Sequence, residues 1–433
     1  MTQFLRRGGL TLVVISVLAL YGWEAHARRE IDPTPLNRAD QAAYLNYARN
    51  MRETNYAVAG DRNRMPVFPF LLSLVYRRGM TDAEFLGRAQ SFNINLSILL
   101  VGLLFLILRR FLAGLPSTAL LVVAAFGVYV YRAGTVQVEP LYYFLGFCAF
   151  VLLLQMLIAP RWWLAILAGI VTAVAYLTKA SMLPTILIWA AVFFAQTVWE
   201  CRHAHLPELG RRFGQLLVVL GTFGGVIFPY ERTSKQLYAH YFFNVNSAYY
   251  MWCDSWPEAL AFTEAWRGGN VASNQVPSPA KYWREHSPVQ IAERLLHGLK
   301  TVATRSVKPA GYYKFTALVI LAIGVATARQ PQRARRLIAE TPFAGAFCLL
   351  FFSVFTLLYA WYDAVVTDSR FILSLFLPLM FVGSAVVRYV GTNDAFVIGS
   401  RLWAVPSIYG AALICLSLID IAYNALRIMR VLT

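Results

Sequence analysis

Five charged residues stand beside apolar segments, where charge is costly and often functional. They are two carboxylates and three cations, namely Asp40, Glu139, Arg64, Lys179 and Arg370. Arg and Lys bind phosphate groups, and they stabilise the negative charge that develops as a phosphate leaves. A carboxylate within reach can take the proton from an attacking hydroxyl or amine. The set therefore suits the transfer of a group from a phosphate-bearing lipid.

Each of the five also has an ordinary structural interpretation. Asp40 fits a solvated position on an amphipathic loop helix. Lys179 and Arg370 fit the ends of membrane spans, where long side chains reach the interface. Glu139 stands before Pro140, which is typical of a helix N-terminus. The functional interpretation gains weight if one topology brings all five residues to the same face of a membrane.

The elements that must position these residues are membrane spans. Of the 433 residues, 58% are hydrophobic and 14% are charged, whereas soluble domains carry about 25% charged residues. A helix of roughly 20 apolar residues can cross a bilayer. About eleven such segments recur along the chain, which predicts an all-α integral membrane protein. They lie near 8–23, 89–108, 115–131, 138–159, 162–178, 183–199, 213–229, 311–328, 343–361, 371–387 and 402–425.

The basic residues of the short loops set the expected orientation, because cytoplasmic loops carry an excess of Arg and Lys. With the N-terminus inside, the arginine pairs at 109–110 and 335–336 fall on the cytoplasmic side. The short outer loops then hold only Arg132, Lys179 and Arg370. This orientation predicts a multi-pass protein whose five candidate residues share the outer, periplasmic face.

Two long outer loops, at about 24–88 and 230–310, divide the chain. We expect a first module over 1–229, a periplasmic cap over 230–310 and C-terminal spans over 311–433. In the first loop the apolar stretch 67–72 is too short to span, which predicts a re-entrant or interfacial helix. Thr81 and Glu84 predict a capping box at the start of the second span. An acidic metal pair at Asp82 and Glu84 is the alternative.

The net charge of +17 in a membrane protein indicates loops that touch anionic lipid or bind phosphate. No RNA-binding motif or zinc-ligand spacing accompanies it, so no nucleic-acid partner is expected. The cap loop is rich in tryptophan, which we interpret as interfacial anchors, with a sugar-stacking platform as the alternative. These tryptophans are Trp252, Trp256, Trp266 and Trp283.

The order of these features resembles the GT-C superfamily of integral membrane glycosyltransferases, near its protein O-mannosyltransferase and aminoarabinose transferase types. Asp40 stands where that superfamily has an acidic residue soon after the first span. Arg64-Met65-Pro66 matches its basic residue close before a proline. Three further matches are Glu139-Pro140-Leu141, Thr178-Lys179, and Arg370 in a late span that continues to Pro378.

The resemblance implies a glycosyltransferase of the bacterial inner membrane that uses a polyprenyl-phosphate sugar as donor. The acceptor would be an envelope glycan, lipid or protein, and a single displacement would invert the anomeric carbon. Asp40 would be the general base and Glu139 would position acceptor or sugar. The donor phosphate would be held by Arg64, Lys179 and Arg370. The sequence contains no Asp-x-Asp, so it does not support a divalent metal, and no other cofactor is expected.

Two other functions remain open at this stage. An O-antigen polymerase or ligase also has many spans and a large outer loop, and His240, His286 and His297 in the second loop suit it. A lipid or sugar transporter without covalent chemistry is the second alternative. A transporter favours charges within the middle of its spans, whereas these charges lie at span ends.

Overall fold

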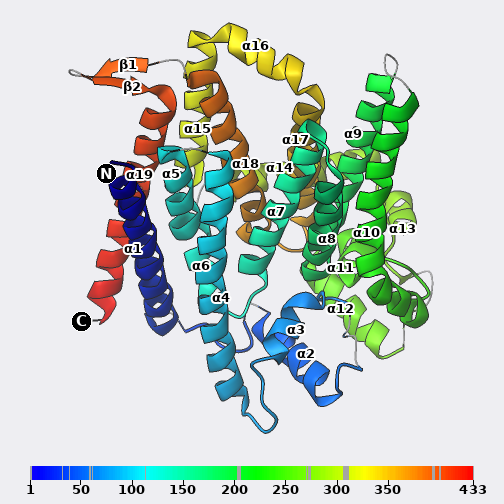
Figure 1. Cartoon of the computed structure of the whole chain (residues 1–433). Coiled ribbons are helices and arrows are strands. Elements are labelled where there is room, and N and C mark those ends of the chain that lie inside the picture. The colour runs from blue at the N-terminus through cyan, green and yellow to red at the C-terminus, as the bar shows by residue number, and fades with distance from the viewer. Residues whose placement is uncertain are drawn as a thin grey trace.

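The computed structural model of the chain describes residues 2–31, 33–38, 40–57, 60, 62–112, 114–201, 206–269, 271, 275–305, 312–392, 395–398 and 401–432. Within these ranges, ten helices are long and apolar enough to cross a membrane. The shorter apolar helix α8 (Trp162–Thr178) has 17 residues, the lower end of a spanning length. Together they account for the eleven expected spans, and the chain is an all-α integral membrane protein (Figure 1).

The long helices stand side by side in Figure 1. They are α1 (Thr2–Ile31), α4 (Asp82–Phe111), α5 (Leu115–Ala124) continued by a π-helical turn (Ala125–Tyr129) into α6 (Val130–Ala133), α7 (Glu139–Ile158), α9 (Leu183–Cys201), α10 (Leu206–Tyr238), α15 (Tyr312–Arg329), α17 (Pro342–Tyr362), α18 (Ser369–Gly391) and α19 (Val405–Leu432).

The shorter helices lie at the ends and on the flank of the bundle. At the lower end in Figure 1 lie α2 and α3, while α16 lies at the opposite end. The bounds are α2 (Gln41–Glu53), α3 (Val67–Ser73), α11 (Val245–Ala248), α12 (Trp256–Arg267), α13 (Pro279–Glu285), α14 (Pro288–Arg305) and α16 (Pro331–Glu340), with 3₁₀ turns at Ala180–Met182 and Tyr250–Trp252.

The capping box predicted in the first loop is confirmed, and so is the helix at 67–72. The apolar stretch forms the short helix α3, while its re-entrant or interfacial position stays a prediction. The Thr81 hydroxyl accepts from the Glu84 amide at 3.3 Å, and the Glu84 carboxylate accepts from the Thr81 amide at 2.9 Å. This capping box starts α4 because it satisfies amides that have no partner within the helix. Asp82 is instead paired with Arg49 on α2.

Several helices run further than their apolar segments predicted, and in two of them a charged residue lies in the extension. The first span, expected at 8–23, continues in α1 to Ile31, where Arg28 reaches back one turn to Glu24 at 2.6 Å. The seventh, expected at 213–229, continues in α10 past Pro229 to Tyr238. The buried Glu231 holds this extension, because its carboxylate accepts from the Tyr176 hydroxyl at 2.8 Å.

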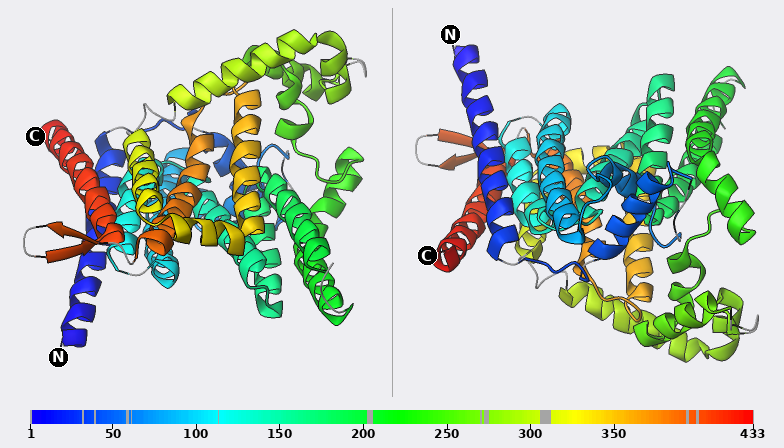
Figure 2. Two further views of the ribbon diagram at one scale, coloured as in Figure 1. Left: turned by 90° about the horizontal axis from the view of Figure 1, so that it is seen from above. Right: turned by 90° about the horizontal axis from the view of Figure 1, so that it is seen from below.

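A two-stranded hairpin precedes the last span. Strands β1 (Ala395–Ile398) and β2 (Arg401–Ala404) are antiparallel, with Ala395 opposite Ala404. Figure 2 shows the hairpin projecting from the bundle beside α19. The last span was expected from 402, but its helix begins at Val405 because the preceding residues pair as a strand.

The packing places α7 at the centre of the bundle, against α4, α8, α17 and α18. The first residue of α7 is Glu139, so the central helix presents this carboxylate at its N-terminal end. On the flank, α14 packs along α17. A β-carbon at Gly298 would collide with the carbonyl oxygen of Ala360, so this contact between the two helices requires glycine.

Candidate active site

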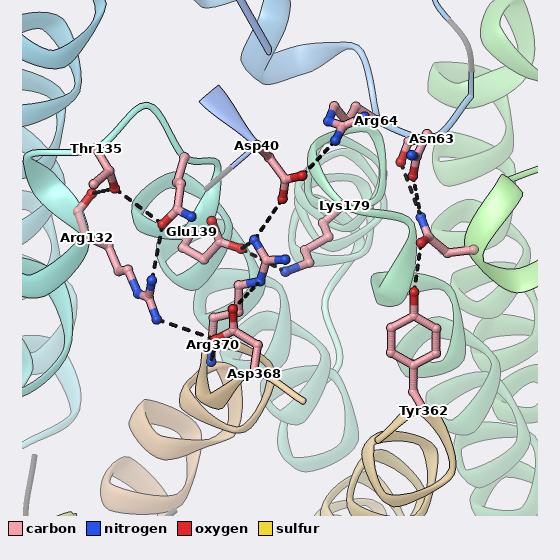
Figure 3. A network of polar contacts seen from close by, with 12 residues as sticks. Asp40, Asn63, Arg64, Arg132, Thr135, Glu139, Lys179, Tyr362, Asp368 and Arg370 are labelled. Carbon is pink, nitrogen blue, oxygen red and sulfur yellow. Dashed lines mark hydrogen bonds and ion pairs between the residues drawn. The ribbon is translucent and has the colours of Figure 1, made fainter. Parts of the chain in front are cut away.

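A cavity of about 360 Å³ lies between the first loop, the end of α8 and the starts of α7 and α18. All five residues singled out in the sequence border it, although they come from five separate segments. Figure 3 shows their side chains converging. The structure therefore brings together the complete predicted set, Asp40, Arg64, Glu139, Lys179 and Arg370.

Asp40 occupies an unusual position for a residue that precedes a helix. An aspartate at the N-cap ordinarily accepts from the first helical amides, but the Asp40 side chain makes no such bond to α2. Its backbone is left-handed, with φ of 64°, a conformation that costs free energy for any residue other than glycine. The carboxylate instead accepts from Arg64 at 2.7 Å and from Arg370 at 3.0 Å.

The charge of Asp40 is stabilised by these two partners. Burial by itself raises the pKa of the Asp40 carboxyl, but the Arg64 and Arg370 guanidiniums outweigh burial and hold that pKa below its ordinary value. Asp40 is therefore ionised at neutral pH. The same two ion pairs make its carboxylate a weak base for as long as they persist.

Glu139 and Lys179 form a second, more deeply buried pair. The Lys179 ammonium lies 3.2 Å from Glu139 Oε1, and the Glu139 side chain is only 2% exposed. Lys179 is extended, with φ of −154°, where α8 ends and a 3₁₀ turn begins. This break in the helix directs its side chain to α7. Glu139 Oε2 is buried and accepts no hydrogen bond from the described residues.

Arg370 connects the two pairs. Its guanidinium lies 3.0 Å from Asp40, 3.8 Å from Glu139 and 3.1 Å from Asp368. Asp368 also caps α18 by accepting from the Arg370 amide at 2.9 Å. The same carboxylate oxygen, Oδ1, lies 3.5 Å from Arg132. One connected network therefore joins α2, α6, α7, α8 and α18 (Figure 3).

Sequence reasoning missed Arg132 and Asp368 as members of this network. Two signals were present: Arg132 is one of the few basic residues in a short outer loop, and Asp368 lies two residues before Arg370. The network contains four cations and three carboxylates, an excess of one positive charge, with the members Arg64, Arg132, Lys179, Arg370, Asp40, Glu139 and Asp368.

A neutral polar wall borders the same cavity and was also missed. The Asn246 amide donates to the side-chain oxygen of Asn63 at 2.8 Å, and the Tyr362 hydroxyl donates to Asn246 at 2.9 Å. Asn63 directly precedes Arg64, so this wall adjoins the charged network. The only signal in the sequence was the run Asn244-Val245-Asn246-Ser247 after the seventh span.

The aromatic and histidine residues of the cap have different positions. Trp256 borders the cavity, which favours the stacking interpretation for this tryptophan. Trp252 packs on Trp361 with ring centroids 5.9 Å apart, and Trp283 is 60% exposed. The described residues that border the cavity do not include the candidate histidines, which are His240, His286 and His297.

Within the described ranges, no three His, Cys, Asp or Glu side chains gather as metal ligands would. The side chains that border the cavity offer several kinds of chemistry. These are carboxylates that can accept a proton, cations that can bind an anion, and amides and hydroxyls that can bind neutral polar groups.

Fold and site together define a multi-pass α-helical membrane protein with an ion-paired cavity at one end of its helices. No family model and no curated protein matches the chain. A solved structure that is similar to it is the crystal structure of ArnT from Cupriavidus metallidurans bound to undecaprenyl phosphate. The match covers 88% of this chain and 78% of that chain, at 14% identity and a TM-score of 0.34. Membership of the GT-C superfamily stays a prediction.

Proposed function

We propose that this chain is a membrane glycosyltransferase that moves a sugar from a polyprenyl-phosphate donor to a cell-envelope acceptor. The observation that carries the proposal is the charged network at the cavity, in which four cations face three carboxylates. A phosphodiester bears one negative charge, which balances this excess. Apolar side chains of α9 and α17 border the same cavity, among them Leu183, Phe355 and Leu358. They suit the first isoprene units of the lipid.

In the proposed reaction the acceptor hydroxyl or amine attacks the anomeric carbon of the donor sugar. The bond between that carbon and the phosphate oxygen breaks, and its electron pair stays with the phosphate. Asp40 takes the proton of the acceptor, while Glu139 positions acceptor or sugar. The charge on the departing phosphate is balanced by Arg64, Lys179 and Arg370. A single displacement inverts the configuration.

Because Asp40 is paired with two arginines, the donor has to bind before Asp40 can act as the base. Arg64 and Arg370 both donate to Asp40 in the structure, which makes the carboxylate a weak base. A donor phosphate competes for the same two guanidiniums. When they turn to the phosphate, Asp40 loses its stabilising partners and becomes more basic. The base is thereby strengthened only after the donor has bound.

The two alternatives fit these observations less well. The histidines that suited a polymerase or ligase do not line the cavity. A transporter without covalent chemistry has no need of a carboxylate held by two cations at the helix ends, as Asp40 is. A transporter can be distinguished from the proposed enzyme by incubating the purified protein with a labelled polyprenyl-phosphate sugar and envelope lipids. The enzyme should release polyprenyl phosphate, whereas a transporter releases none.

The role of Arg64 can be tested by donor binding. Arg64→Ala removes one charge-assisted contact to the phosphate, worth about 1.5–3 kcal/mol, so donor affinity should fall roughly tenfold or more. Arg64→Lys keeps the charge but loses the planar fork and should retain part of the affinity. Titration of the purified variants with a polyprenyl-phosphate sugar measures both. Arg78→Ala, an exposed residue of the same loop, is the control. Unchanged affinity in Arg64→Ala would remove Arg64 from the phosphate site.

We also propose that the cavity faces the periplasm of a bacterial inner membrane. The short basic helix α16 lies at the end of the bundle opposite α2 and α3 (Figure 1). A reporter fused after Arg336 should therefore signal cytoplasm, and one fused after Gly269 should signal periplasm. A periplasmic signal from the α16 fusion would reverse the orientation and place the charged network on the cytoplasmic side.

A further inference from the structure

The neutral wall of the cavity is as constrained as the charged network beside it. We call Asn63, Asn244, Asn246 and Tyr362 the amide wall; all four border the cavity. The Asn244 side chain is held at both of its polar atoms. Its oxygen accepts from the backbone N–H of Asn246 at 3.0 Å, and its nitrogen donates to the backbone carbonyl of Arg62 at 2.9 Å. Asn246 in turn connects Asn63 to Tyr362.

The amide wall is built from three segments that are distant in sequence. They are the first loop, the start of α11 and the end of α17. Their hydrogen bonds cross 183 residues between Asn63 and Asn246, and 116 between Asn246 and Tyr362. Trp256, which also borders the cavity, adds an aromatic surface. Amides and hydroxyls that both donate and accept, next to an aromatic ring, suit the hydroxyls and apolar face of a sugar.

The charged residues of the cavity adjoin this wall but already have partners of opposite charge. The cations that border the cavity are paired with carboxylates, and on the proposed function they turn to the phosphate. The amide wall itself consists of uncharged side chains. A carboxylate on the sugar would find the cations of the cavity already paired and would meet Glu139, another carboxylate, at the same cavity. Burying such an unpaired charge is strongly unfavourable.

We propose that the amide wall binds the sugar of the donor and selects a monosaccharide without a carboxylate. The inference rests on the proposed function and adds the substrate class. The cavity volume of about 360 Å³ is near the lower limit for ligand pockets, which suits one sugar and its phosphate. Glu139 Oε2, buried and without a donor among the described residues, is placed to accept from a sugar hydroxyl at the same cavity.

Binding of three probes to the purified full-length protein tests the inference. The probes are undecaprenyl phosphate, its glucosyl ester and its glucuronyl ester. The wild type should bind the glucosyl ester at least tenfold more tightly than the glucuronyl ester. Asn246→Ala and Tyr362→Phe should each lower the affinity for the glucosyl ester roughly two- to tenfold, which is the effect of losing one or two hydrogen bonds. Both should leave undecaprenyl phosphate within twofold of wild type.

Tyr362→Phe removes a single oxygen atom, so it tests the amide wall even if Asn246→Ala fails to fold. Asn50→Ala, an exposed amide of α2, is the matched control and should change nothing. Equal binding of the two esters, or an equal loss of affinity for all three probes in both wall variants, would overturn the sugar assignment while the phosphate site stands. If the wild type binds none of the three, the proposed function fails and the inference fails with it.

Discussion

Asp40→Asn is expected to bind the donor at least as well as wild type and to turn it over 10²–10⁴-fold more slowly, the range that base catalysis typically contributes. The substitution keeps the size of the side chain and removes its charge. Arg64 and Arg370, which Asp40 holds in the structure, are then released for the phosphate. Single-turnover rates with saturating donor separate the lost chemical step from binding.

Asp82→Asn is the control for this experiment. Asp82 lies on the same side of the bundle and pairs with Arg49, but it is exposed and does not border the cavity. Its variant should keep nearly full turnover. If Asp40→Asn turns over normally while Glu139→Gln is inactive, Glu139 is the base. If both carboxylate variants remain active, the acceptor needs no base from this network.

Glu139→Gln is expected to destabilise the protein by about 3–5 kcal/mol, because removing one partner of a buried ion pair leaves the other charge uncompensated. Lys179 lies 3.2 Å from Glu139 and would then face Arg370 without the intervening carboxylate. Lys179→Met should cost less, since Arg370 remains 3.8 Å from Glu139. Thermal unfolding of the purified variants in one detergent ranks them.

The double variant Glu139→Gln/Lys179→Met completes the cycle. Removing both charges should recover most of the stability lost by Glu139→Gln, because neither partner is left uncompensated. Turnover should not recover, since the donor still lacks Lys179. Additive losses of stability in the double variant would show that the two residues are not coupled, and would contradict the geometry of the network.

The sequence by itself determined the membrane class and the number of spans, because a bilayer admits a helix only where the chain is apolar over a sufficient length. It also determined local signals that need no partner, such as the capping box at Thr81 and Glu84 and the helix at 67–72. Helix ends were less predictable. Arg28 and Glu231 extend α1 and α10 through contacts with other residues, which hydropathy does not report.

The candidate residues were found because a charge beside an apolar span is visible in sequence. Their partners were not. Asp40 binds Arg370 across 330 positions, and Asn246 binds Asn63 across 183. A single asparagine in a polar loop, or a tyrosine at the end of a span, gives little signal by itself, since both are common wherever the chain meets water. Only the packing of α7, α8, α17 and α18 decided that the charges form one network and that neutral amides lie beside it. Buried polar groups require hydrogen-bond partners, and these partners come from distant parts of the chain.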